Sequence, residues 1–327
     1  PRHLPLRERV AKGELISPTI YTSGPSFNGN SVPAKETAIQ MVREQKAAGY
    51  DFLKIHPGVR REVFDALAAT ADQVGIRFAG HVPLDVGLRR ALEAKYATID
   101  HLDGYLEALL RDDAPVKAAQ SQGFGINLVQ YLDESKIPQL AEWTREAGTS
   151  MVPTEILLEN WMSDEDPEVM ARRPEMKYAS SQDVAKWVEA NKKRTADIPS
   201  ADRRRFVEIR RKLIKALHAG GVRFLLGSDA PQVWNVPGFS VHRELKTLVA
   251  SGLTPFQALE TGTRNVATFF KTSDLTGTLA AGKRADLVLL EGNPLDDIGN
   301  TSRIAGVVLR GRWLSREEAE KRLQTEP

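Results

Sequence analysis

Short apolar runs alternate with amphipathic stretches over much of the chain. The intervals from Lys54 to His81 and from His81 to His101 each have room for one strand, one helix and two short loops, the size of a βαβ unit. In the first interval, apolar residues recur at helical spacing over Val59–Val74. Repeated units of this kind predict a parallel sheet, either open or closed into a barrel. The predicted strands are Thr19–Ser23, Phe52–His56, Arg77–His81, Thr98–His101, Ser150–Thr154 and Arg223–Ser228.

Two later segments depart from this rhythm. Residues 155–217 are charged and helix-prone, and a lid over a barrel mouth is one interpretation of the segment. Its Met and Trp side chains favour internal packing over a cofactor site. After residue 275, short apolar runs joined by Gly and Asn-Pro turns predict a small β domain. We therefore expect residues 1–275 to form the (β/α) part of the protein and residues 276–327 the small β domain.

Composition narrows the functional classes. The 45 basic and 43 acidic residues nearly balance, giving a formal net charge of +2, which argues against nucleic acid or an anionic membrane as the main partner. No apolar run reaches about 18 residues, so no transmembrane helix is expected. The chain has no cysteine, which is compatible with any cellular compartment and leaves His, Asp, Glu or a modified Lys as candidate metal ligands. It opens at Pro1 without a signal-peptide pattern, and a removed leader and a truncated start both stay open.

Four polar residues stand at or near the ends of predicted strands: Lys54, His81, His101 and Asp229. A barrel presents the C-terminal ends of its strands at one mouth, where residues distant in sequence converge. Imidazole and carboxylate groups are ligands for Zn²⁺, and a site that keeps one position for water is catalytic. Taken singly, each residue has a simpler interpretation, such as a structural histidine, a paired lysine or an Asx turn. Their shared position at successive strand ends favours a metal site.

Several motifs resemble the amidohydrolase superfamily, in its imidazolonepropionase-like and prolidase-like branch. The resemblance covers nearly the whole chain and is most specific over residues 227–313. It implies a TIM-type (β/α) barrel with a small β domain, and a metal-dependent hydrolase acting on carbon–nitrogen bonds. The motifs are Gly227-Ser228-Asp229-Ala230, Val241-His242-Arg243-Glu244-Leu245, Thr261-Gly262-Thr263-Arg264-Asn265, Gly282-Lys283-Arg284-Ala285-Asp286 and Gly292-Asn293-Pro294-Leu295.

The resemblance also implies roles for single residues. Lys54 matches a lysine that reacts with CO₂, giving a carbamate that bridges two metals. His81 and His101 match the ligands of the second metal, and Asp229 matches a ligand of the first metal that also carries a proton. The implied cofactor is one or two divalent ions, with Zn²⁺ expected.

One departure from the family pattern is serious. The family completes its first metal with a His-x-His pair, and none of the six histidines here forms one. His3 lies in sequence that resembles the family after its second strand, so we expect an incomplete barrel that lacks the first two strands and part of the small β domain. A fragment, a partner that supplies the rest, and a broken site are the alternatives. A non-catalytic homologue is the rival function, and the exposed sheet edges would favour association into a homo-oligomer.

Further residues are candidates for substrate binding. His56 follows Lys54 by two positions and therefore faces the same side of a strand. Tyr105 falls on a predicted mouth loop and His242 follows the Asp229 loop, whereas His218 is expected to be structural. The expected substrate is a small amide, such as a dipeptide with a C-terminal Pro, or a cyclic amide. A metal-dependent ester or organophosphate hydrolase is the nearby alternative.

Overall fold

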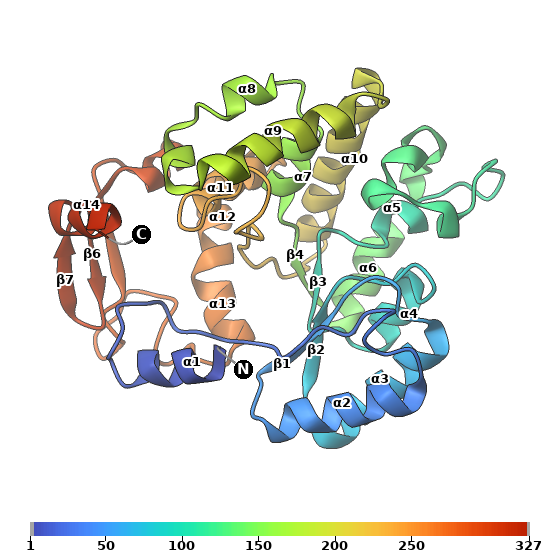
Figure 1. Cartoon of the computed structure of the whole chain (residues 1–327), viewed down its shortest axis with the longest axis horizontal. Coiled ribbons are helices and arrows are strands. Elements are labelled where there is room, and N and C mark those ends of the chain that lie inside the picture. The colour runs from blue at the N-terminus through green and yellow to red at the C-terminus, as the bar shows by residue number, and fades with distance from the viewer. Residues whose placement is uncertain (1–2, 326–327) are drawn as a thin grey trace. The chain divides into compact units, whose positions relative to one another are not determined.

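The computed structural model describes residues 3–325 (Figure 1). The chain divides into two compact units. Unit 1 comprises Pro1–Val152 with Gly220–Val222, and unit 2 comprises Pro153–Ala219 with Arg223–Pro327. The division thus falls after the fourth strand, and the predicted boundary between residues 275 and 276 stays a prediction.

A four-stranded parallel sheet organises unit 1. Its strand order β1-β2-β3-β4 follows the sequence, and neighbouring strands pair without an interruption in register. This confirms the parallel sheet expected from the alternating pattern. Within residues 3–325 this sheet has four strands, whereas a closed (β/α)-barrel needs eight. The strands are β1 (Phe52–Ile55), β2 (Arg77–Gly80), β3 (Thr98–Asp100) and β4 (Ser150–Val152).

Two of the six predicted strands do not form as sheet strands. From Thr19–Ser23, only Ser23 makes a bridge, to Phe52, and Phe27 makes a second bridge further along β1. The segment 223–228 lies in unit 2, where the Leu226 amide donates to the Thr261 carbonyl. Its apolar side chains pack in the core of that unit, which satisfies the hydrophobic pattern without a ladder.

Helix α3 forms where the spacing of apolar residues over Val59–Val74 predicts a helix. The apolar stripe of α3 is buried as expected, and the helix ends at Gly75 in the left-handed conformation that glycine adopts at helix C-termini. Helix α2 packs along α3. Two further helices, α4 and α6, contact each other. The bounds are α1 (His3–Ala11), α2 (Lys35–Ala47), α3 (Arg61–Val74), α4 (Gly87–Glu93), α5 (Tyr105–Ala108) and α6 (Ile137–Ala147).

Between α5 and α6 the chain forms a long loop of short 3₁₀ turns. Its base is closed by an antiparallel bridge between Leu110 and Leu132, where the Arg111 amide donates to the Tyr131 carbonyl at 2.9 Å. We call residues 110–132 the cover loop. Its middle turn packs against α5. The 3₁₀ turns of this region are η1 (Ala118–Gln120), η2 (Gly123–Tyr131) and η3 (Glu134–Lys136).

The helix-prone part of unit 2 forms helices, as its composition predicts. Met170, Met176 and Trp234 belong to a buried cluster against which Trp187 packs. This confirms internal packing for these Met and Trp side chains. The elements are α7 (Glu155–Trp161), α8 (Pro167–Met170), η4 (Pro174–Tyr178), α9 (Ser181–Thr195), α10 (Ser200–Ala219), α11 (Ser240–Ala250), α12 (Pro255–Gly262) and α13 (Arg264–Phe269).

The C-terminal part of unit 2 contains the expected small β structure. Its three strands form one antiparallel sheet in the order β5-β6-β7, and α14 contacts β6 and β7. Within residues 287–325 the β structure is therefore one sheet with one helix against it. No helix in the described part of the chain has both the length and the apolar character to cross a bilayer. The elements are β5 (Leu287–Leu290), η5 (Ile298–Ser302), β6 (Ile304–Leu309), β7 (Arg312–Ser315) and α14 (Arg316–Thr325).

Candidate functional site

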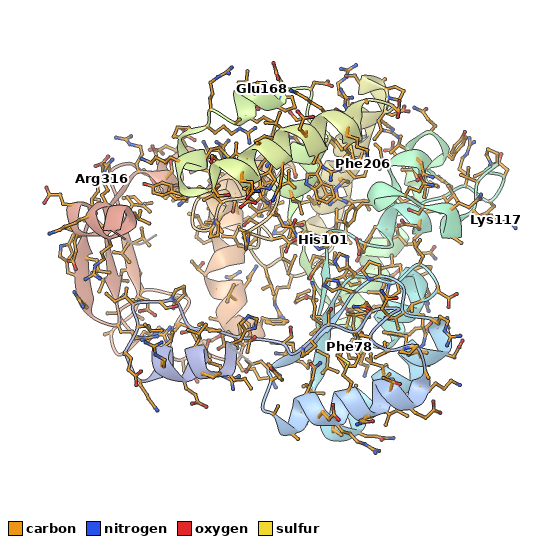
Figure 2. The ribbon with its side chains drawn as sticks, in the orientation of Figure 1. Phe78, His101, Lys117, Glu168, Phe206 and Arg316 are labelled. Atoms are coloured by element: carbon orange, nitrogen blue, oxygen red, sulfur yellow. The ribbon has the colours of Figure 1, made fainter. Side chains whose placement is uncertain are left out.

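Three strands of unit 1 bring histidines together at their C-terminal ends. His56, His81 and His101 directly follow β1, β2 and β3, and Figure 2 marks His101 at the end of its strand. The ring centroids of His81 and His101 lie 4.6 Å apart, and the His56 ring meets His81 edge-on at 5.0 Å. Parallel pairing in register produces this grouping, because it sets equivalent strand ends side by side.

Lys54 lies on β1 and pairs with an acid from β3. Its Nζ donates to Asp100 Oδ2 at 2.6 Å, and Thr98 donates to the other carboxylate oxygen at 3.1 Å. The side chains of Lys54 and Asp100 are 28% and 17% exposed. Burial opposes ionisation of Asp100, but the charges of Lys54 and His101 outweigh it and lower the pKa of this carboxyl. Lys54 is therefore held in an ion pair with Asp100.

His81 is fixed through its ring and its backbone. Its Nδ1 lies 2.7 Å from Asp103 Oδ2, and the Tyr96 hydroxyl donates to its carbonyl oxygen at 3.0 Å. Burial, with the charges of Asp103 and Asp100, raises the pKa of Tyr96 well above its usual value, so this hydroxyl stays protonated as a donor. The preceding Gly80 has φ +124°, and a Cβ there would collide with the Ile55 carbonyl oxygen. Glycine therefore allows β2 to end directly beside β1.

His101 sits on an unusual backbone. His101 and Leu102 both have positive φ, 61° and 57°, immediately after β3. Its amide donates to the Val152 carbonyl at 3.0 Å, and its side chain is almost completely buried. Two successive residues in the left-handed region carry a conformational cost that the surrounding structure must offset, a feature that clusters at functional sites.

The two imidazoles fit the donor chemistry of a divalent cation. A carboxylate that holds one ring nitrogen of a ligating histidine is a common arrangement, and Asp103 does this for His81, leaving its Nε2 for a metal. Lys54 cannot ligate as an ammonium ion, which has no lone pair, and would do so only after losing a proton or after conversion to a carbamate anion. Among residues 3–325, no group of three or more His, Asp and Glu side chains is placed to hold a metal.

Asp229 belongs to unit 2. It is exposed, has φ +56°, and ends the extended segment that begins at Arg223. The preceding Ser228 is buried and lies 2.7 Å from Ser240, oxygen to oxygen, and Asn235 donates to the Ser228 carbonyl. These contacts fix the backbone before Asp229, and the predicted metal and proton roles of its carboxylate stay predictions.

Two of the proposed substrate contacts have structural partners. Tyr105 is fully buried, with its hydroxyl 2.6 Å from Thr144 Oγ1, and burial raises its pKa. His242 Nδ1 lies 3.1 Å from Thr301 Oγ1 within unit 2, and burial lowers the pKa of this imidazole. Their predicted contacts with substrate stay predictions. His56, beside His81, remains the candidate for substrate contact, and His218 packs near Phe224 as expected of a structural histidine.

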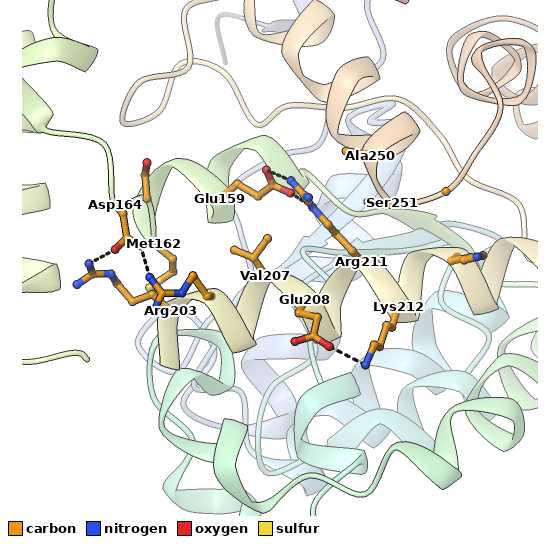
Figure 3. Close-up of a pocket in the computed structure, with 14 residues that line it drawn as sticks. Glu159, Met162, Asp164, Arg203, Val207, Glu208, Arg211, Lys212, Ala250 and Ser251 are labelled. Atoms are coloured by element: carbon orange, nitrogen blue, oxygen red, sulfur yellow. Dashed lines mark hydrogen bonds and ion pairs between the residues drawn. The ribbon is translucent and has the colours of Figure 1, made fainter. Parts of the chain in front are cut away.

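A cavity of about 600 Å³ lies within unit 2, along α10 (Figure 3). Its charged walls are largely paired with each other. Arg211 binds both carboxylate oxygens of Glu159, at 2.7 and 2.8 Å, and Lys212 binds Glu208 at 2.7 Å. The cavity contains none of the residues predicted for the site, and its ion pairs leave little unsatisfied charge for a ligand.

Sequence reasoning overlooked three residues around the imidazoles. Asp100 and Asp103 flank His101 in the chain, and acids so near a candidate ligand were the available signal. Phe124 comes from the cover loop, and its ring centroid lies 5.6 Å from that of His101. Only the flanking Gly123 and Gly125 marked it as part of a turn, and neither indicated contact with His101.

Comparison with known proteins places the chain in a family. The profile described as "Amidohydrolase family" matches residues 5–314. No curated protein matches significantly. Among solved structures, the chain is similar to a Xaa-Pro dipeptidase with bound methionine in the active site (18% identity, TM-score 0.65, covering 96% of this chain and 72% of that one).

Two more solved structures show the same likeness. The bottromycin amidohydrolase has 21% identity and a TM-score of 0.70, with 98% of this chain and 71% of that one covered. A putative prolidase from Bifidobacterium longum has 23% identity and a TM-score of 0.63, with 96% and 70% covered. At these identities the structures show a shared fold, and the sequence profile carries the assignment. The chain belongs to the amidohydrolase family.

Proposed function

We propose that this protein is a metal-dependent hydrolase that cleaves the carbon–nitrogen bond of a small amide. The observation that carries the proposal is the His81–His101 pair, 4.6 Å apart beside Lys54 at adjacent strand ends. Family membership supports hydrolysis. The similar dipeptidase and prolidase structures favour a dipeptide with a C-terminal Pro over a cyclic amide as substrate.

His81 and His101 are proposed to hold a divalent cation, with Zn²⁺ expected because both donors are imidazole nitrogens. A bound cation of this kind lowers the pKa of water and polarises a carbonyl group. The Lys54 amine, once neutral, would bond to the carbon of CO₂ and lose a proton, giving a carbamate anion. This step requires Lys54 to leave its ion pair with Asp100, so carboxylation competes with that pair.

Asp229 is proposed to carry the proton. In hydrolysis the water oxygen bonds to the carbonyl carbon, the carbon–nitrogen bond breaks, and the leaving nitrogen needs one proton. A carboxylate can take a proton from the attacking water and deliver it to that nitrogen. The Gly227-Ser228-Asp229-Ala230 motif supports this role, and His56 beside His81 is proposed to contact the substrate.

A metal and activity measurement tests the proposal. The purified chain is supplied with Zn²⁺ and bicarbonate, its metal content is measured by elemental analysis, and Xaa-Pro dipeptides and cyclic amides are assayed. We expect bound zinc, hydrolysis, and a mass increase of one CO₂ that Lys54→Met abolishes. Lys46→Met is the control, because Lys46 is exposed on α2 and its Nζ donates to the Gly75 carbonyl. Absence of both zinc and hydrolysis would contradict the proposal.

Replacing the proposed proton carrier gives a second test. Asp229→Asn removes the basic carboxylate but keeps the shape of the side chain, so we expect kcat to fall by about 10²–10⁴-fold. Asp274→Asn is the control, because Asp274 is an exposed acid of the same unit. Equal kcat values for Asp229→Asn and the unchanged protein would show that Asp229 does not carry the proton. They would not contradict the proposal that His81 and His101 bind a metal.

A non-catalytic homologue is the second candidate. The observations that favour it are the Lys54–Asp100 ion pair, the lack of a His-x-His pair in the sequence, and the lack of a third ligand beside the imidazoles among the described residues. In this case the two histidines would bind a single cation weakly. Zinc binding without hydrolysis of any amide would support this candidate.

A further inference from the structure

The cover loop belongs to unit 1, and its contacts hold one of its turns in place. The bridge at its base is reinforced by the Asp133 amide, which donates to the Leu109 carbonyl at 2.7 Å. Near its middle, Gly125 has φ +87° and lies so close to α5 that a Cβ there would come within 2.8 Å of the Leu106 side chain. The turn is therefore fixed at its base and pressed onto a helix, which limits its freedom to move.

Phe124 occupies this turn in a conformation that bulky residues rarely adopt. Its φ and ψ are 62° and 32°, in the left-handed region. Gly and Asn often adopt this conformation, whereas a bulky residue such as Phe rarely does. An ordinary turn would be expected to place glycine or asparagine here. A strained bulky residue therefore needs an account of what its side chain does.

The side chain contacts the proposed metal ligands. The centroid of the Phe124 ring lies 5.6 Å from that of His101, nearly edge to face, and 6.4 Å from that of His81. Both imidazoles thus have an apolar ring beside them, while Phe124 itself is only half-buried. A partly exposed aromatic surface next to two candidate ligands is available to a bound substrate.

We propose that Phe124 is a specificity-determining residue, an apolar wall that packs against an apolar group of the amide substrate beside His81 and His101. This inference rests on the proposed function and deepens it. The favoured substrates carry an aliphatic or aromatic group on the acyl side of the scissile bond. Apolar contact of this kind discriminates substrates by tens of fold, because a polar group placed there loses water without gaining a partner.

Two substitutions separate the ring from the strained backbone. Phe124→Asn removes the ring but suits the left-handed conformation, and Phe124→Leu keeps an apolar side chain. Leu-Pro and Ser-Pro are the probes. We expect the unchanged protein to have a higher kcat/KM for Leu-Pro than for Ser-Pro. The ratio of the two values should fall about tenfold in Phe124→Asn and change little in Phe124→Leu. Phe256→Asn is the control, because Phe256 is an exposed phenylalanine of unit 2.

A measurement independent of activity tests the placement of the ring. The imidazole proton resonances of His81 and His101 should move in Phe124→Asn, because the ring current of Phe124 is lost, while those of His242 should not. Unmoved His81 and His101 resonances would overturn the proposal, as would equal losses for Leu-Pro and Ser-Pro.

The two proposals fail in distinguishable ways. If the unchanged protein hydrolyses neither dipeptide, the apolar wall is tested by the binding of leucinamide and serinamide to the zinc-loaded chain. The proposed function itself fails only if the protein hydrolyses no cyclic amide either. Tighter binding of leucinamide that Phe124→Asn reduces supports the wall, and equal effects on both amides refute it.

Discussion

The charged clusters of the two units differ in what surrounds them. In unit 1, Lys54 and Asp100 retain 28% and 17% of their side-chain exposure and lie beside histidines at strand ends. In unit 2, Glu155 and Arg210 are entirely buried and bind each other at 2.9 Å. The first pair can be opened to solvent and replaced by other partners, whereas separating the second would leave a buried charge alone.

Glu244 completes the buried cluster of unit 2. Its two carboxyl oxygens accept from the backbone amides of Glu155 and Ile156, at the start of α7, at 3.0 and 2.7 Å. The group therefore supplies acceptors that the first turn of a helix lacks. The comparison teaches that charge density does not by itself mark a functional site. Partial exposure of Lys54, Asp100 and His81, and their position at successive strand ends, distinguish the unit 1 cluster from the buried cluster of unit 2.

The largest expected effect comes from breaking the buried pair. Arg210→Met leaves Glu155 without its cation, and we expect the free energy of unfolding to fall by about 3–5 kcal/mol. The double substitution Arg210→Met with Glu155→Leu should recover much of this loss, because it removes both charges. Urea denaturation measures both. A cost below about 1 kcal/mol for the single change would show that the pair is not isolated from water.

The next effect concerns the histidine cluster. Asp103→Asn removes the carboxylate that holds His81, and we expect zinc affinity to fall by about 10–100-fold while thermal stability changes little. Titration calorimetry with Zn²⁺ measures the affinity. Asp72→Asn on α3 is the matched control, since Asp72 is exposed. Unchanged affinity would mean that Asp103 does not orient His81 for a metal.

Stability should depend on pH through Glu244. Burial, reinforced by the charges of Glu155 and Glu159 and opposed by the two backbone hydrogen bonds, raises the pKa of Glu244 to about 8 in the folded state. The folded protein then holds a proton that the unfolded chain has lost above its ordinary pKa near 4.5. Stability should therefore fall as pH rises from about 4.5 to about 8, by up to ~1.4 kcal/mol per pH unit, and level off above.

Glu155 should also make stability fall as pH rises, because burial raises the pKa of its carboxyl in the folded state. Denaturation of the unchanged protein and of Glu244→Gln across pH 5–9 should show a shallower slope in the variant. Glu318→Gln is the control, because Glu318 is a partly exposed acid paired with Arg322. Identical slopes for Glu244→Gln and the unchanged protein would show that Glu244 is ionised in the folded state.

The smallest effect is expected along the cavity of unit 2. Lys212 and Glu208 are 44% and 53% exposed and pair across one turn of α10. Lys212→Ala should cost only about 0.3–0.5 kcal/mol, less at high salt, because solvent screens exposed pairs. Urea denaturation at two salt concentrations measures this. A loss as large as that of Arg210→Met would show that exposure does not separate the two regions energetically.

The spacing of apolar residues was sufficient to predict much of the secondary structure of unit 1. The period of the apolar residues predicted α3 and the four strands of the sheet, because each side chain's burial follows from its own spacing. It failed at residues 223–228, which look like a strand but satisfy their backbone through Thr261 and Asn265. An apolar run predicts that its side chains are buried, but a strand is only one of several backbone conformations that can bury them.

The candidate site was predictable only in part, for the same reason. His81 and His101 stood out because each follows an apolar strand, and parallel pairing does bring their rings together. Tyr105 was a secondary candidate on a predicted mouth loop, yet it begins a helix and its side chain is buried against Thr144. Which way a side chain turns after a strand depends on its neighbours in space.

The sequence by itself determined the family, the parallel arrangement and the strand ends at which chemistry could occur, because these follow from motifs, spacing and the side-chain alternation of strands. Only the tertiary structure decided that Asp100 binds Lys54, that Asp103 holds His81, and that Phe124 lies over the imidazole pair. Each of these contacts joins segments whose separation in the chain carries no local signal, and each depends on backbone turns that packing alone selects.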